Sequence, residues 1–96
     1  MKLRVDVMPE AAEALEARTA WLSERSADDA LRFHDDVFNH LDLVALGLLE
    51  GPEHRLPSGE LARRLVVPPL LIFYQREADA IRVVFVHDAR QRPFDR

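Results

Sequence analysis

The clearest pattern of apolar and polar positions is a helical stripe across the middle of the chain. Its apolar members recur every three or four positions: Ala30, Phe33 or His34, Val37, Leu41, Val44 and Leu48. A helix that buries one face requires this spacing. Ser26 opens a Ser-x-x-Asp capping pattern before the stripe, and Gly51-Pro52 follows it. These signals predict a helix over residues 28–49.

Another helix is predicted upstream, over residues 10–24. Pro9 suits a first helical position, where its missing N–H costs nothing. The residues after it are dense in Ala, Leu, Glu and Arg, which favour helices, and Leu15, Trp21 and Leu22 belong to its apolar face. A connection this short requires the two helices to run in opposite directions, so residues 10–49 are expected to form a helical hairpin.

Strands are predicted on both sides of this hairpin. Residues 2–7 alternate between polar and apolar side chains, as a half-buried strand does. Three apolar runs lie in the C-terminal half, at 62–67, 70–76 and 80–87. Their short connections predict an antiparallel meander. Residues 50–60 hold two of the three glycines and are expected to be a loop.

The predicted fold class is therefore α+β. The order β-α-α-β-β-β describes a two-layer sandwich in which the helical hairpin packs on an antiparallel sheet. No repeat or linker divides residues 1–96, so we expect a single domain. The residues expected in its core are Leu3, Val5, Leu15, Leu22, Val37, Leu41, Val44, Leu65, Ile72, Tyr74, Val84 and Val86.

Composition and charge narrow the range of functions. The absence of cysteine excludes disulfides, thiolate metal sites and a cysteine nucleophile. Residues 1–50 carry 5 basic and 11 acidic side chains, whereas residues 51–96 carry 8 and 6. This distribution suits a protein partner better than a nucleic-acid backbone, and no sequence-specific nucleic-acid contact is expected. No apolar run is long enough to span a bilayer, and we expect a cytoplasmic protein without cofactors.

Histidines are the main candidates for chemistry. His34 and His40 lie beside two aspartates on the second predicted helix, but no third ligand group is evident, so a solvated surface without metal is expected. His87 differs because it ends the last predicted strand, where a rigid scaffold can present a general acid or base. Arg63 and Arg64 are neighbours on one strand and must point to opposite faces, so they cannot form one basic patch.

Residues 71–90 read Leu-Ile-Phe-Tyr-Gln-Arg, an acidic turn, and then an apolar strand that closes on His-Asp-Ala-Arg. This stretch resembles the end of ParE-type toxins in the RelE/ParE superfamily. The short first strand, the proline that opens helix one and the late tryptophan of that helix agree with this resemblance. Pro68-Pro69-Leu70 departs from it, since Gly-Arg-Tyr is usual there. The resemblance implies that the first strand pairs with the last, giving the sheet order 1-4-3-2.

The resemblance also implies a role in a bacterial type II toxin–antitoxin system. ParE-type members inhibit DNA gyrase by binding, whereas RelE-type members cleave mRNA on the ribosome. Leu71 stands where an RNA-cleaving relative would carry a strand arginine, so we expect a binding inhibitor of gyrase rather than a catalyst. Two alternatives stay open: a RelE-type endonuclease, in which His87 would be catalytic, and a non-toxic relative that only binds its antitoxin.

Two binding regions are predicted. Leu31, Phe38, Leu46 and Leu49 lie off the main stripe of helix two, and we expect them to form an apolar strip for a ParD-like antitoxin with a ribbon-helix-helix domain. Arg90, Arg92 and Phe94 combine cations with an aromatic side chain in the polar tail, and we expect them to contact gyrase.

Overall fold

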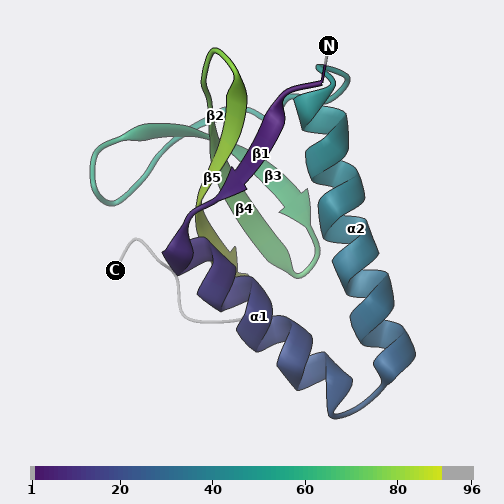
Figure 1. Ribbon diagram of the computed structural model, residues 1–96. Coiled ribbons are helices and arrows are strands. Elements are labelled where there is room, and N and C mark those ends of the chain that lie inside the picture. Colours follow the sequence, from purple (N-terminus) through teal and green to yellow (C-terminus); the bar gives the residue numbers. More distant parts are fainter. Residues whose placement is uncertain (1, 90–96) are drawn as a thin grey trace.

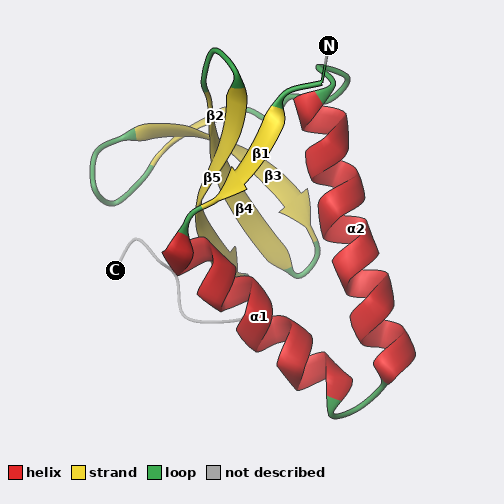
Figure 2. Cartoon of the chain, in the orientation of Figure 1, coloured by secondary structure: helices red, strands yellow, loops and turns green. Residues whose placement is uncertain are grey.

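The computed structural model describes residues 2–89 and contains two helices and five strands (Figure 1). The chain runs through these elements in the order β1 (Arg4–Val7), α1 (Pro9–Ser23), α2 (Ala27–Ala45), β2 (Glu53–Arg55), β3 (Leu61–Val67), β4 (Leu70–Arg76) and β5 (Ala80–Asp88). Both helices lie on one side of the sheet and diverge from their short connection like the arms of a V (Figure 2). The α+β class and the predicted pair of oppositely directed helices are confirmed.

Helix α2 begins as predicted and ends earlier than predicted. The Ser26 hydroxyl accepts a hydrogen bond from the Asp29 N–H at 3.2 Å, which is the expected cap. The helix stops at Ala45 because Gly47 adopts a φ of 79°. The N–H groups of Gly47 and Leu48 then donate to the carbonyls of Val44 and Leu43, a Schellman termination. The predicted end at residue 49 is wrong, and Leu48 is 73% exposed instead of continuing the buried stripe.

Helix α1 matches its prediction within one residue at each end. Met8 precedes it without a side-chain cap, and Pro9 occupies the first turn. Leu15 is buried, whereas Leu22 is only half-buried. Trp21 is 41% exposed, so its placement on the buried face is wrong. The ring lies beneath the guanidinium groups of Arg18 and Arg25, at 4.6 and 3.8 Å from the ring centre.

The sheet has the order β1-β5-β4-β3-β2. The four predicted strands correspond to β1, β3, β4 and β5. The predicted order 1-4-3-2 is therefore β1-β5-β4-β3, and it is confirmed, with the first strand beside the last. The predicted loop over 50–60 is wrong in part, because Glu53–Arg55 form a short edge strand against β3. Such a short segment, with charged side chains at both ends, lacks the apolar alternation by which strands are recognised.

The prediction of a wholly antiparallel sheet is also wrong. Strands β2 to β5 pair antiparallel, but β1 runs parallel to β5, with Val5 opposite Ile81. The argument from short connections applies only to strands that follow each other along the chain. Between β1 and β5 lie both helices and three strands, so no turn determines their relative direction.

The main core lies between the helices and the sheet. Its buried members include most of the predicted core: Leu15, Val37, Leu41, Val44, Leu65, Ile72, Tyr74 and Val86. Leu3 and Val5 pack against it but are half-buried, because β1 is an edge strand. The opposite face of the sheet carries a smaller cluster of Leu56, Ala62 and Phe73, with Leu71, Val84 and Phe85 against it.

A bulge in β5 explains why the core prediction for Val84 fails. Phe73 pairs with Phe85 while Tyr74 pairs with Val83, so Val84 is an extra residue on β5. Val83 is therefore fully buried beneath the helices, and Val84 lies half-buried on the opposite face. The alternation of side chains changes phase at this point, which a strict period of two cannot anticipate.

Candidate functional surfaces

An apolar groove lies between the two diverging helices. Its walls come from both helices and from the end of β1, and include Leu15, Thr19, Phe33, Val37 and Phe38. Phe38 is half-buried and packs against the main core, and its ring lies 4.7 Å from the His34 ring. This helix groove can accept an apolar segment, and Phe38 is the one predicted antitoxin residue that lines it.

The other three predicted antitoxin residues do not join Phe38 in this groove. Leu31 is on α2 and 64% exposed, while Leu46, 48% exposed, caps the other end of that helix. Leu49 follows α2 and packs partly against the main core. Because the helix ends at Ala45, the helical spacing that placed Leu46 and Leu49 with Leu31 and Phe38 no longer applies.

The face of the sheet opposite the helices is a second candidate surface, here called the open sheet face. An aromatic row crosses it from β2 to β5: the His54 ring lies 5.0 Å from Phe73, and Phe73 lies 5.9 Å from Phe85. Phe73 is fully buried, and Leu56 from the β2–β3 turn is buried in the same cluster. The row is therefore a small second core, with Arg64 and Val66 of β3 beside it.

His87 lies on this face near the end of β5. Its partner across the sheet is Leu71, and Leu71 in turn pairs with Val66. The aliphatic Leu71 therefore stands directly beside the one predicted catalytic histidine. The predicted target-binding residues, Arg90, Arg92 and Phe94, lie outside the described residues, so they stay a sequence-based prediction.

A polar cluster that sequence reasoning missed joins the end of α2 to the sheet. Glu50 forms ion pairs with Arg76 at 3.0 Å and Arg63 at 3.7 Å. The Arg76 guanidinium also donates to the Val44 carbonyl at 3.2 Å. The Gly51 N–H donates to the hydroxyl of buried Tyr74 at 2.8 Å. This cluster fixes the chain as it leaves α2, and only the three-dimensional fold brings its members together.

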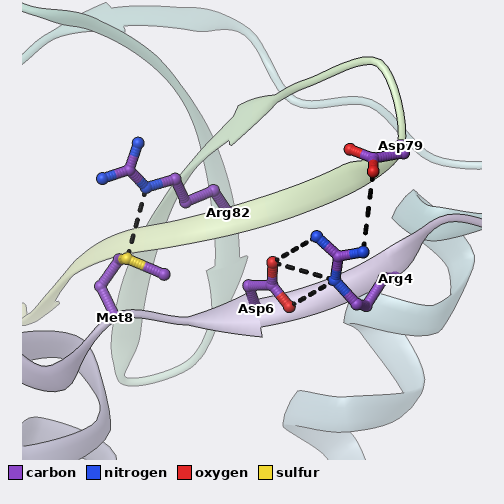
Figure 3. A network of polar contacts seen from close by, with 5 residues as sticks. All are labelled: Arg4, Asp6, Met8, Asp79 and Arg82. Carbon is purple, nitrogen blue, oxygen red and sulfur yellow. Dashed lines mark hydrogen bonds and ion pairs between the residues drawn. The ribbon is translucent and has the colours of Figure 1, made fainter.

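Charged side chains also connect β1 to β5 (Figure 3). The Arg4 guanidinium donates three hydrogen bonds of 2.9 to 3.1 Å to the Asp6 carboxylate and lies 3.7 Å from Asp79. On β5, Arg82 contacts the Met8 sulfur at 3.3 Å and Glu77 at 3.5 Å. The hydrogen bonds from Arg4 lower the pKa of Asp6, and those bonds together with the charge of Asp6 raise the pKa of Arg4.

This pKa shift gives a prediction for acid titration. A carboxyl group whose pKa is lowered in the folded chain stabilises it above the unfolded pKa and loses that contribution as the pH falls. We therefore expect the Asp6 carboxyl to titrate below its ordinary range in a carbon-detected NMR titration, and to return toward that range in Arg4→Gln. The pair is exposed, so the change in stability should be small. An unchanged midpoint in Arg4→Gln would contradict the pairing.

Both histidines of α2 lie close to aspartates of the same helix, His34 exposed and His40 half-buried. The His40 ring nitrogen Nδ1 lies 2.6 Å from the Asp36 carbonyl, and His34 lies 3.7 Å from Asp35, with its ring against Phe38. Within residues 2–89, no group of three or more His, Asp or Glu side chains could hold a metal ion. Neither helix in the described part of the chain is long and apolar enough to cross a membrane.

The arrangement is that of a small α+β protein, with an apolar helix groove on one side of the sheet and a mixed aromatic and basic surface on the other. Comparison with known families identifies it further. The family model for the ParE toxin of the type II toxin–antitoxin system parDE matches residues 5–93. The chain therefore belongs to the ParE toxin family, and this family implies a ParD antitoxin as partner. No curated protein matches the chain.

Proposed function

We propose that this chain inhibits DNA gyrase by binding it and is neutralised by its ParD antitoxin. Membership of the ParE toxin family supports a toxin with an antitoxin partner. The observation that favours binding over RNA cleavage is the pairing of His87 with Leu71. A nuclease must stabilise charge on a phosphate in the transition state with fixed donors or cations. An aliphatic side chain at the position beside the histidine does not supply this stabilisation.

The antitoxin is proposed to bind across the helices. Phe38 and the walls of the helix groove offer a half-buried apolar site, and Leu31 is a separate exposed apolar side chain on the same helix. An amphipathic antitoxin helix would bury its apolar face here. Leu46 and Leu49, at the other end of α2, would extend the contact beyond the groove.

The target is proposed to contact the end of β5 and the tail that follows it. His87 and Asp88 bring the chain to that end of the sheet, and Arg90, Arg92 and Phe94 follow directly in the sequence. Cations next to an aromatic side chain are typical anchors of protein interfaces. Deletion of residues 88–96 is expected to weaken the inhibition of gyrase strongly in a supercoiling assay. The melting temperature of the chain should change much less.

The substitution His87→Ala tests whether toxicity includes a chemical step. If the chain acts by binding, cells that express the variant should still stop growing, and a DNA-damage response should precede any arrest of translation. A lost general acid or base would instead lower a cleavage rate by about 10²–10⁴. Purified chain is therefore also incubated with ribosomes carrying mRNA, and thermal melting of the variant serves as the folding control. Cleavage of mRNA by the wild type that is lost in His87→Ala would contradict the proposal.

A further inference from the structure

Arg64 is exceptional among the arginines of residues 2–89. Every other arginine there has an ion pair or a side-chain hydrogen bond: Arg4 with Asp6, Arg18 with Asp88, Arg25 with the Trp21 carbonyl, Arg32 with Asp29, Arg55 with the Gly59 carbonyl, Arg63 and Arg76 with Glu50, and Arg82 with Glu77. The guanidinium of Arg64 has neither, and its Nε is buried without a hydrogen-bond partner. The net charge of the chain is −4, so this cation lacks a partner although acidic groups are in excess.

The fold holds Arg64 firmly in this position. It lies in the middle of β3 on the open sheet face, paired with the fully buried Phe73. Its backbone N–H donates to the Pro52 carbonyl at 3.0 Å, and its carbonyl is packed so closely against Gly51 that no Cβ fits there. A half-buried cation on a rigid strand loses little further entropy when it binds an anion.

The surroundings of Arg64 indicate which anion it would accept. Its neighbours on the face are apolar or aromatic: Phe73 across the strand pair, Ala62 on one side, and Val66, which is 50% exposed, on the other. The remaining guanidinium donors form a planar fork that matches a carboxylate. Binding a nucleic-acid backbone takes several cations together, whereas Arg63 on the same strand is paired on the opposite face with Glu50. A single carboxylate within an apolar peptide segment fits this surface best.

We propose that the open sheet face is a second docking surface for the antitoxin, and that an Asp or Glu side chain of the antitoxin pairs with Arg64. The inference rests on the proposed neutralisation by a ParD antitoxin and extends the contact from the helices to the other layer of the fold. Apolar residues of the same segment would cover Val66. The complex would then compensate a charge that the free chain leaves unpaired.

Arg64→Gln tests this inference through two readouts. Because Arg64 has no partner in the free chain, the variant should melt at the same temperature as the wild type or higher. Because one partner of a desolvated charge pair is removed, its dissociation constant for the ParD antitoxin should rise about 30-fold or more. Arg64→Lys should restore only part of the affinity, since an ammonium group lacks the planar fork.

Arg82→Gln is the matched control, since Arg82 lies on β5 and is already paired with Glu77. We expect its affinity for the antitoxin to stay within about twofold of the wild type, as is usual for a charge that an interface does not use. Wild-type affinity in Arg64→Gln would overturn the inference and leave the proposed function intact. A lowered melting temperature in Arg64→Gln would also overturn it, because Arg64 would then be a structural residue.

Two further results separate the inference from the proposed function. If Arg64→Gln binds the antitoxin normally but no longer inhibits gyrase, the carboxylate belongs to the target and the antitoxin assignment is wrong. If the wild-type chain binds no ParD antitoxin at all, the proposed neutralisation itself fails, and this inference fails with it. Phe38→Ala separates failure of the Arg64 contact from failure of antitoxin binding as a whole. It should weaken antitoxin binding through the helix groove while Arg64 stays in place.

Discussion

Leu41→Ala is expected to lower the free energy of unfolding by about 2–5 kcal/mol. Leu41 is fully buried where α2 faces the sheet, in the same cluster as Val37 and Ile72. Truncation removes the favourable transfer of its side chain from water and leaves a cavity between two rigid layers. Urea denaturation followed by circular dichroism measures the loss.

Leu31→Ala is the matched control for Leu41→Ala. It makes the same chemical change on the same helix, but Leu31 is 64% exposed, so its effect on stability should stay within about 0.5 kcal/mol. If Leu41→Ala costs less than about 1 kcal/mol, the buried face of α2 has been assigned incorrectly. Leu31→Ala should weaken antitoxin binding more than Leu41→Ala does, since only Leu31 belongs to the proposed contact.

Gly51→Ala is expected to destabilise the chain by about 3 kcal/mol or more. A Cβ at this position would lie 1.8 Å from the Arg64 carbonyl oxygen, which is backbone and cannot rotate away. The segment must then move, and the Gly51 N–H would lose its 2.8 Å hydrogen bond to Tyr74. The shift would also disturb β3 next to Arg64, so affinity for the antitoxin should fall with stability.

Gly47→Ala separates steric overlap from backbone strain. Gly47 has a φ of 79° but nothing within 4 Å of a Cβ, so alanine there meets only the strain of the left-handed conformation. That strain costs about 1–2 kcal/mol. Thermal or urea unfolding should rank Gly51→Ala as the more damaging variant. The reverse order would contradict the close approach of Gly51 to β3.

Local patterns predicted most of the helices and strands of this fold. The stripe of α2 identified Val37, Leu41 and Val44, and Ser26 marked the start of the helix, because both signals act within a few residues. The end of α2 was misplaced since a glycine can terminate a helix without any proline after it, and Gly47 does so here. Gly51, which looked like the terminator, is instead required by its contact with Arg64.

Features that depend on distant parts of the chain could not be read from the sequence. The parallel pairing of β1 with β5 and the bulge at Val84 are features of how strands pair with one another, and the pattern within a single strand does not determine them. The same holds for the binding surfaces. The alternation along β3 placed Arg63 and Arg64 on opposite faces, but only the structure shows that Glu50 pairs with Arg63 and leaves Arg64 without a partner.

A supercoiling assay with purified gyrase tests the central claim most directly. The purified chain, without any nucleotide or metal beyond what gyrase itself needs, is titrated into the reaction, and the ParD antitoxin is then added. The account predicts that supercoiling stops as the chain saturates gyrase and resumes when the antitoxin binds the chain. Undiminished supercoiling by gyrase, with a chain that is folded and still arrests growth when expressed, would contradict it.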